Sequence, residues 1–148
     1  MREGMSQAIF GSFDGLSCVL GVIAAGYIAG DFHALALSAV GLALAEGIAM
    51  AGGSYLSDVT SVNSLRHAGI IGGAAFVGVL LPALPFLVAP RQIALALSIL
   101  LTIALAVLIA QVRAPTGGRI RAYAQTFAIL VVAAFASIAV SLALNGAG

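Results

Sequence analysis

The chain has 148 residues, of which 62% are hydrophobic and only 7% are charged, and its formal net charge is +1. Soluble domains carry about 25% charged residues, so this composition excludes a water-soluble fold. The small net charge also argues against nucleic acid as a partner. A single cysteine, Cys18, excludes an internal disulfide and a multi-cysteine metal cage.

Five apolar segments are long enough to cross a bilayer, because a spanning helix needs about 20 mostly apolar residues. The sequence therefore predicts an all-α polytopic membrane protein in which residues 1–148 form a single transmembrane helical bundle domain. Pro82 and Pro85 predict a kink near the end of the third span. The predicted spans cover residues 8–30, 34–57, 68–89, 92–112 and 123–144.

The first segment has the outline of a secretory signal, with Arg2 ahead of an apolar run. Asp14 interrupts that run, which a cleaved signal rarely tolerates. We therefore expect the segment to be a retained first helix, and the lipid bilayer to be the medium around it.

Arginine placement predicts the orientation, because cytoplasmic loops of membrane proteins are enriched in positive charge. If the five spans alternate in direction, the N-terminus is cytoplasmic and the C-terminus is external. Arg91 is then the one arginine on the external side. Five arginines lie on the cytoplasmic side, at positions 2, 66, 113, 119 and 121.

Pairs of glycines four residues apart predict close contacts between helices, because a missing side chain lets another backbone approach. Such pairs occur at Gly11 and Gly15, at Gly26 and Gly30, and at positions 69 and 73. The first pair flanks Asp14, so we expect a homodimer to form through the first helix. The alternative is that glycine is simply common in membrane helices.

Two acids, Asp14 and Glu46, fall inside predicted spans. Each costs roughly 2.5–3.5 kcal/mol to insert, so each calls for an explanation. Counted from the predicted helix ends, Asp14 lies roughly 9 Å deep, Met50 roughly 10 Å and Glu46 about 16 Å. Asp14 and Met50 are thus predicted to lie at similar depth on consecutive helices.

Four side chains recur every four residues along the second span and form one stripe: Glu46, Met50, Ser54 and Asp58. Carboxylate and hydroxyl oxygens suit Mn²⁺ and Fe²⁺, and a thioether adds a preference for transition metals over Mg²⁺ or Ca²⁺. A carboxylate in a low dielectric also holds a proton more readily, which suits exchange of a proton for a metal. With Asp14, these four residues are the predicted metal ligands.

Structural readings of the same residues stay open. Asp14 and Glu46 can be paired or protonated structural acids, although no arginine is predicted at their depth. Met50 can serve as packing, Ser54 can bond back to the helix, and Asp58 can be an ordinary helix-end residue. Cys18 lies one turn beyond Asp14, and we interpret it as a small buried apolar side chain.

Two motifs in the first two spans resemble the vacuolar iron transporter family, which includes plant and yeast iron and manganese transporters and bacterial relatives. Residues 10–16 read FGSFDGL and residues 19–22 read VLGV, close to the family pattern F-G-x-x-D-G-L-x-x-x-x-G. Residues 49–57 read AMAGGSYLS, against a family pattern near S-M-A-x-G-E-Y-x-S. The remaining spans are similar to the family only in number, polarity and orientation.

The resemblance implies a five-helix homodimer that exports Fe²⁺ or Mn²⁺ from the cytoplasm in exchange for protons. It places Asp14 and Met50 along a metal path at the dimer interface. It also implies an integral protein of the cell membrane in a bacterium or of the vacuolar membrane in a eukaryote. The metal is the transported substrate, and no cofactor is expected.

The chain departs from the family pattern at two points. Ser54 stands where the family has a glutamate, and the glutamate-rich cytoplasmic extension between the second and third spans is missing. Glu46, two turns deeper on the same stripe, is our candidate replacement for the lost carboxylate.

Alternative functions are a non-transporting or sensor-like homologue and a structural membrane scaffold. An enzyme is not expected, because the sequence has no nucleophile–base pair, phosphate loop or zinc-protease motif.

Overall fold

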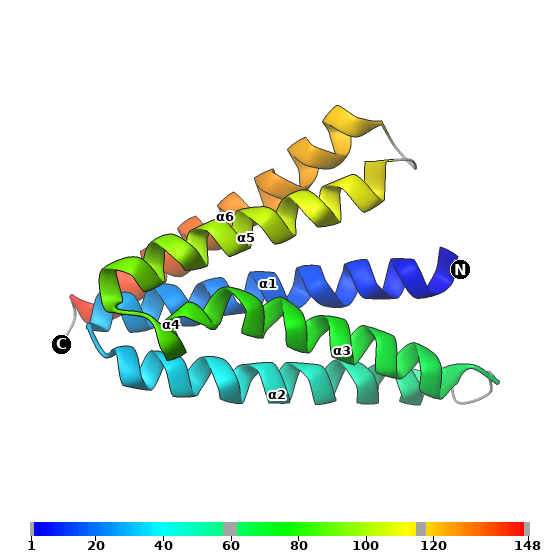
Figure 1. Cartoon of the computed structure of the whole chain (residues 1–148), viewed down its shortest axis with the longest axis horizontal. Coiled ribbons are helices and arrows are strands. Elements are labelled where there is room, and N and C mark those ends of the chain that lie inside the picture. The colour runs from blue at the N-terminus through cyan, green and yellow to red at the C-terminus, as the bar shows by residue number, and fades with distance from the viewer. Residues whose placement is uncertain (1, 58–61, 115–117, 147–148) are drawn as a thin grey trace.

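The computed structural model describes residues 2–57, 62–114 and 118–146 as a bundle of helices (Figure 1). All helices except the short α4 are long and apolar enough to cross a membrane, which confirms the fold class and the five predicted spans. In chain order the helices are α1 (Arg2–Ala29), α2 (Phe32–Ser57), α3 (Ser64–Ala83), α4 (Pro85–Val88), α5 (Arg91–Arg113) and α6 (Arg119–Asn145).

Three helices begin earlier than predicted. Helix α1 begins at Arg2 rather than at residue 8, α3 at Ser64 rather than at residue 68, and α6 at Arg119 rather than at residue 123. The predicted ranges counted apolar residues, whereas a helix keeps its backbone hydrogen bonds as it leaves the hydrocarbon layer. The third span is broken rather than merely kinked, because α3 ends at Ala83 and Pro85, which lacks an N–H group, begins α4.

A tight turn makes α1 and α2 antiparallel neighbours. Gly30 ends α1 with a φ of +75°, a conformation that favours glycine. Asp31 then caps α2, since its Oδ1 accepts a hydrogen bond from the backbone N–H of Ala34 at 2.9 Å. The two residues at the first predicted break therefore build the turn themselves.

Helix α3 packs tightly against both α1 and α2, and the contact depends on glycine. A Cβ atom added at Gly11 or Gly15 would overlap the backbone carbonyl oxygen of Ile71 or Ala75 on α3. On the other side of α3, a Cβ atom at Gly72 would overlap the carbonyl oxygen of Gly47 on α2. The three helices therefore approach to backbone contact, as small residues allow in membranes.

The expected role of Gly11 and Gly15 in a dimer is wrong, because both glycines are buried against α3 of the same chain. A Cβ atom at Gly69 or Gly73, which were also expected at helix contacts, would meet nothing within 4 Å. The spacing of four correctly identified Gly11 and Gly15 as positions that another backbone can approach. A helix of the same chain can pack at such a position as well as a helix of a second chain can.

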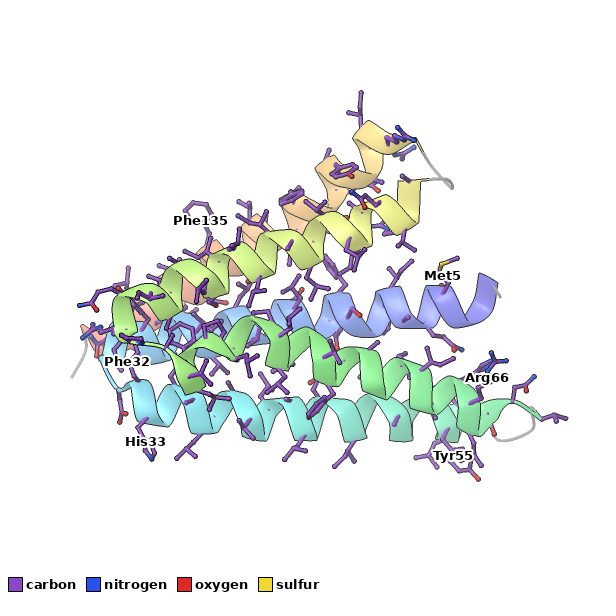
Figure 2. The ribbon with its side chains drawn as sticks, viewed as in Figure 1. Met5, Phe32, His33, Tyr55, Arg66 and Phe135 are labelled. Carbon is purple, nitrogen blue, oxygen red and sulfur yellow. The ribbon has the colours of Figure 1, made fainter. Side chains whose placement is uncertain are left out.

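The end of the bundle opposite the N-terminus is held by an aromatic cluster. The Arg91 guanidinium lies 4.3 Å from the ring centroid of Phe32 and 5.4 Å from that of Tyr27. Phe32 also packs against Phe86 of α4, with ring centroids 6.3 Å apart. These cation–π and aromatic contacts tie the start of α5 to the α1–α2 turn (Figure 2).

The arginines are divided between the two ends of the bundle as predicted. Arg66 lies at the end where α1 begins, and Phe32 and His33 lie at the other end with the C-terminus (Figures 1 and 2). The end of α5 at Arg113 and the start of α6 at Arg119 are also at the N-terminal end (Figure 1). The division agrees with a cytoplasmic N-terminus, which stays a prediction.

We expect Gly15→Ala to lower the stability of the detergent-solubilised protein by about 1–3 kcal/mol, because overpacking a tight contact costs that much. Gly73→Ala is the matched control. Its Cβ meets open space, so the higher helix propensity of alanine should leave stability unchanged or raise it by up to about 1 kcal/mol. Thermal unfolding followed by circular dichroism measures both. Equal effects of the two variants would contradict the packing role of Gly15.

Candidate metal centre

Three side chains from α1 and α2 meet inside the bundle. An oxygen of Asp14, an oxygen of Glu46 and the Sγ atom of Cys18 all lie within 4.8 Å of one another, and all three residues are half-buried. Cys18 is a free thiol one helical turn beyond Asp14. The cluster thus joins two hard oxygen donors and one soft sulfur donor, enough to hold a metal ion from one side.

The glycine contacts with α3 explain why the two acids meet. Each acid immediately precedes a glycine that packs on α3, Asp14 before Gly15 and Glu46 before Gly47. Consecutive side chains on a helix point about 100° apart, so each acid points about 100° away from the direction of its glycine. Because α1 and α2 run antiparallel, this rotation has opposite senses in the two helices when both are viewed along one axis. Both carboxyl groups therefore lie on the same side of α3.

The structure pairs Asp14 with Glu46, whereas the predicted depths paired it with Met50. Asp14 lies twelve residues from the start of α1 at Arg2, or about 18 Å along the axis. Glu46 lies eleven residues from the end of α2 at Ser57, or about 16 Å. Counted along the two helices from the same end of the bundle, Asp14 is therefore level with Glu46.

An oxygen of Asp14 and an oxygen of Glu46 lie within 4.8 Å of each other. An ionised carboxylate only accepts hydrogen bonds, so a hydrogen bond between the two groups requires one of them to carry a proton. Two carboxylates so close in a low dielectric cannot both be charged without a compensating cation. The pair can therefore hold either a shared proton or a metal ion.

Of the other predicted ligands, Met50 and Ser54 are half-buried on α2, one and two turns from Glu46. They continue from the cluster toward the end of the bundle that carries Arg66, and their role as ligands stays a prediction. Asp58 lies outside the described residues.

Sequence reasoning underestimated Cys18 and missed Gln7. The structure brings Cys18 into the cluster, although cysteine is most often a small apolar side chain in membrane helices. The spacing of four from Asp14 was the available signal. Gln7 lies two turns before Asp14 on the same face of α1, and its Oε1 atom is buried with no hydrogen-bond partner in the described part of the chain.

Comparison of the chain with protein-family models, with curated proteins and with solved structures finds no match in any of the three. The geometry of the cluster and the two sequence motifs are therefore the grounds on which a function can be argued.

Cys18 gives a direct test of metal binding, since it is the chain's only cysteine. Saturating Co²⁺ or Mn²⁺ should slow alkylation of Cys18 by N-ethylmaleimide at least about tenfold, because a thiolate bound to metal is not free to attack. Mass spectrometry of the purified protein measures the rate. Asp14→Asn should remove the protection, whereas Asp31→Asn, at an exposed helix cap, should retain it. Equal rates with and without metal would exclude Cys18 as a ligand.

Proposed function

We propose that the chain is a transporter that moves a divalent transition metal out of the cytoplasm in exchange for protons. The observation that carries the proposal is the meeting of Asp14, Cys18 and Glu46 about halfway along two spanning helices. Ionisable side chains at this depth are costly, and in membrane proteins they mark ion and proton pathways. The motif resemblance to iron and manganese transporters supports the same class.

The closeness of the Asp14 and Glu46 carboxyl groups supports coupling to protons, because oxygens within 4.8 Å of each other can share one proton. An arriving divalent cation supplies the charge that lets both carboxyl groups ionise, and the shared proton is then released. Loss of the cation restores the protonated pair. Metal and proton therefore compete for one site, which is the minimal requirement for exchange.

A second copy of the chain completes the coordination in this proposal. The cluster offers three ligand atoms, whereas first-row divalent metals take at least four. The three residues are half-buried, so one side of the site stays open in a single chain. A homodimer that pairs these open sides would supply a second set of ligands.

The thiol in the cluster favours Fe²⁺ over Mn²⁺ as the substrate. Affinity for a given site rises from Mn²⁺ to Fe²⁺, and sulfur ligands strengthen the preference for the softer ion. The same donor set disfavours Mg²⁺ and Ca²⁺, which prefer oxygen ligands alone. The half-buried Met50 thioether, one turn away on α2, adds to this preference if the ion moves along α2.

Asp14→Asn and Glu46→Gln should each reduce metal efflux from proteoliposomes or expressing cells at least tenfold, because each replaces a charged ligand by a neutral side chain of nearly the same size. In Glu46→Gln any residual transport should lose its pH dependence, since no shared proton remains. Asp31→Asn removes an acid at an exposed helix end and should transport normally. Normal efflux with the normal pH profile in Glu46→Gln would make Glu46 structural. Metal binding without efflux by the unaltered protein would favour the sensor-like alternative.

Cys18→Ser should shift the metal preference, because it replaces sulfur by a harder oxygen in a side chain of similar shape. The ratio of Fe²⁺ to Mn²⁺ transport should fall several-fold, while Mn²⁺ transport itself should survive. Anaerobic uptake assays with both metals in one vesicle preparation measure the ratio. Ser17→Ala, on the neighbouring residue whose hydroxyl only bonds back to the Phe13 carbonyl, is the matched control. An unchanged ratio in Cys18→Ser would place Cys18 outside the ligand set.

A further inference from the structure

The charges of this chain are divided along the sequence as well as between the ends of the bundle. All five acids lie within residues 1–58, together with one arginine, and the remaining five arginines lie beyond them. Three of these arginines, Arg113, Arg119 and Arg121, gather where α5 ends and α6 begins, with no acid in either helix. That corner of the bundle is therefore strongly basic for a protein with so few charges.

A series of hollows runs from the same corner along one face of α6. The first lies between the ends of α5 and α6, has a volume of about 380 Å³ and is lined by Gln111, Ala114, Arg119 and Tyr123. The next shares Arg119 and Tyr123 and extends to Phe127. The two hollows share lining residues and therefore adjoin along α6, and we call this row of adjoining hollows the groove.

The groove continues into the bundle as an apolar channel between α1, α5 and α6. Phe127, Leu130 and Ala134 of α6 face Leu20 and Ile23 of α1 across a hollow of about 300 Å³. Its walls are almost entirely hydrocarbon, with Ser98 and Thr102 as the polar lining residues. A further apolar hollow of about 400 Å³ carries the groove past Ala134 toward the other end of α6.

The part of the groove between Arg119 and Ala134 has the length of one lipid of one leaflet. These two positions are fifteen residues apart, or about 22 Å along α6, and the last hollow continues beyond them to Leu142. The hydrocarbon layer of a leaflet is about half of 30 Å thick, and the headgroup region adds several more ångströms. The basic part of the groove thus lies at headgroup level and the apolar part lies at acyl-chain level.

We propose that this groove binds one anionic diacyl phospholipid, with its phosphate at Arg119 and an acyl chain between α1, α5 and α6. Arg119 is exposed and lines the groove together with Tyr123, whose hydroxyl lies at the same level. Basic pockets between spanning helices recognise anionic headgroups in this way.

The surroundings favour a lipid as the occupant. Helix α6 is the least covered of the five spans, so its groove opens onto the membrane. The apolar part of the groove has almost no polar groups to hold water, and acyl chains are the solvent at its depth. Arg113 strengthens the basic corner, and its Nη1 donates a hydrogen bond to the buried Thr126 Oγ1 at 3.2 Å, which fixes α5 on α6.

The test uses the full-length protein, delipidated in detergent and mixed with phosphatidylglycerol or phosphatidylcholine of identical acyl chains. Native mass spectrometry counts the bound lipids. The unaltered protein should retain one phosphatidylglycerol in preference to phosphatidylcholine. An arginine near an anionic lipid contributes roughly a fivefold change in affinity, so Arg119→Gln should reduce the preference about fivefold.

Two control variants separate this site from non-specific binding. Arg66→Gln removes an exposed arginine at the same end of the bundle, away from the groove, and should retain the preference. Ala134→Phe fills the groove and should reduce binding of both lipids, whereas Ala136→Phe, on the exposed side of α6, should not. Equal retention of the two lipids by the unaltered protein would overturn the proposal. Loss of a dimer in Ala134→Phe with lipid binding unchanged would also overturn it and assign the groove to a second copy.

Discussion

The close contact of α1 and α2 with α3 is the constraint on which the rest of the structure depends. Gly11 and Gly15 on one side and Gly72 on the other leave no room for a Cβ atom, and a Cβ atom at Gly47 would lie 3.1 Å from the Phe76 Cβ atom. In a membrane, helices gain little from hiding apolar surface, because lipid is as apolar as leucine. Van der Waals contact between backbones therefore carries much of the association, and only glycine permits it at these positions.

That contact also sets the electrostatics of the candidate metal centre. Asp14 and Glu46 are neighbours in sequence of two contact glycines, so the level and rotation of both acids are fixed by packing on α3. Two acids fixed within 4.8 Å of each other in a low dielectric form a site whose negative charge is uncompensated when both are ionised. A proton or a divalent cation relieves it, and this competition connects helix packing with the proposed exchange reaction.

The two halves of the bundle differ in their charged residues and in how tightly their helices pack. Helices α1, α2 and α3 hold the acids and the close glycine contacts, whereas α5 and α6 hold no acid and are less tightly packed on α1. The looser packing leaves the apolar groove along α6, and Arg119 lines its polar end. An anionic lipid in that groove would support the second half of the bundle against the first without touching the metal centre.

The sequence by itself determined that the chain is an all-α membrane protein with five spans, because hydrophobicity over about 20 residues decides whether a segment crosses a bilayer. It also marked Asp14 and Glu46, since an acid within a span is costly wherever it lies. Their pairing with Cys18 was decided only by the tertiary structure. It depends on the level at which α1 lies beside α2 and on the rotation of each helix, which the contacts with α3 fix. Which helix packs against Gly11 and Gly15 was likewise decided only by the tertiary structure. A spacing of four shows that a backbone can approach but does not show which backbone does.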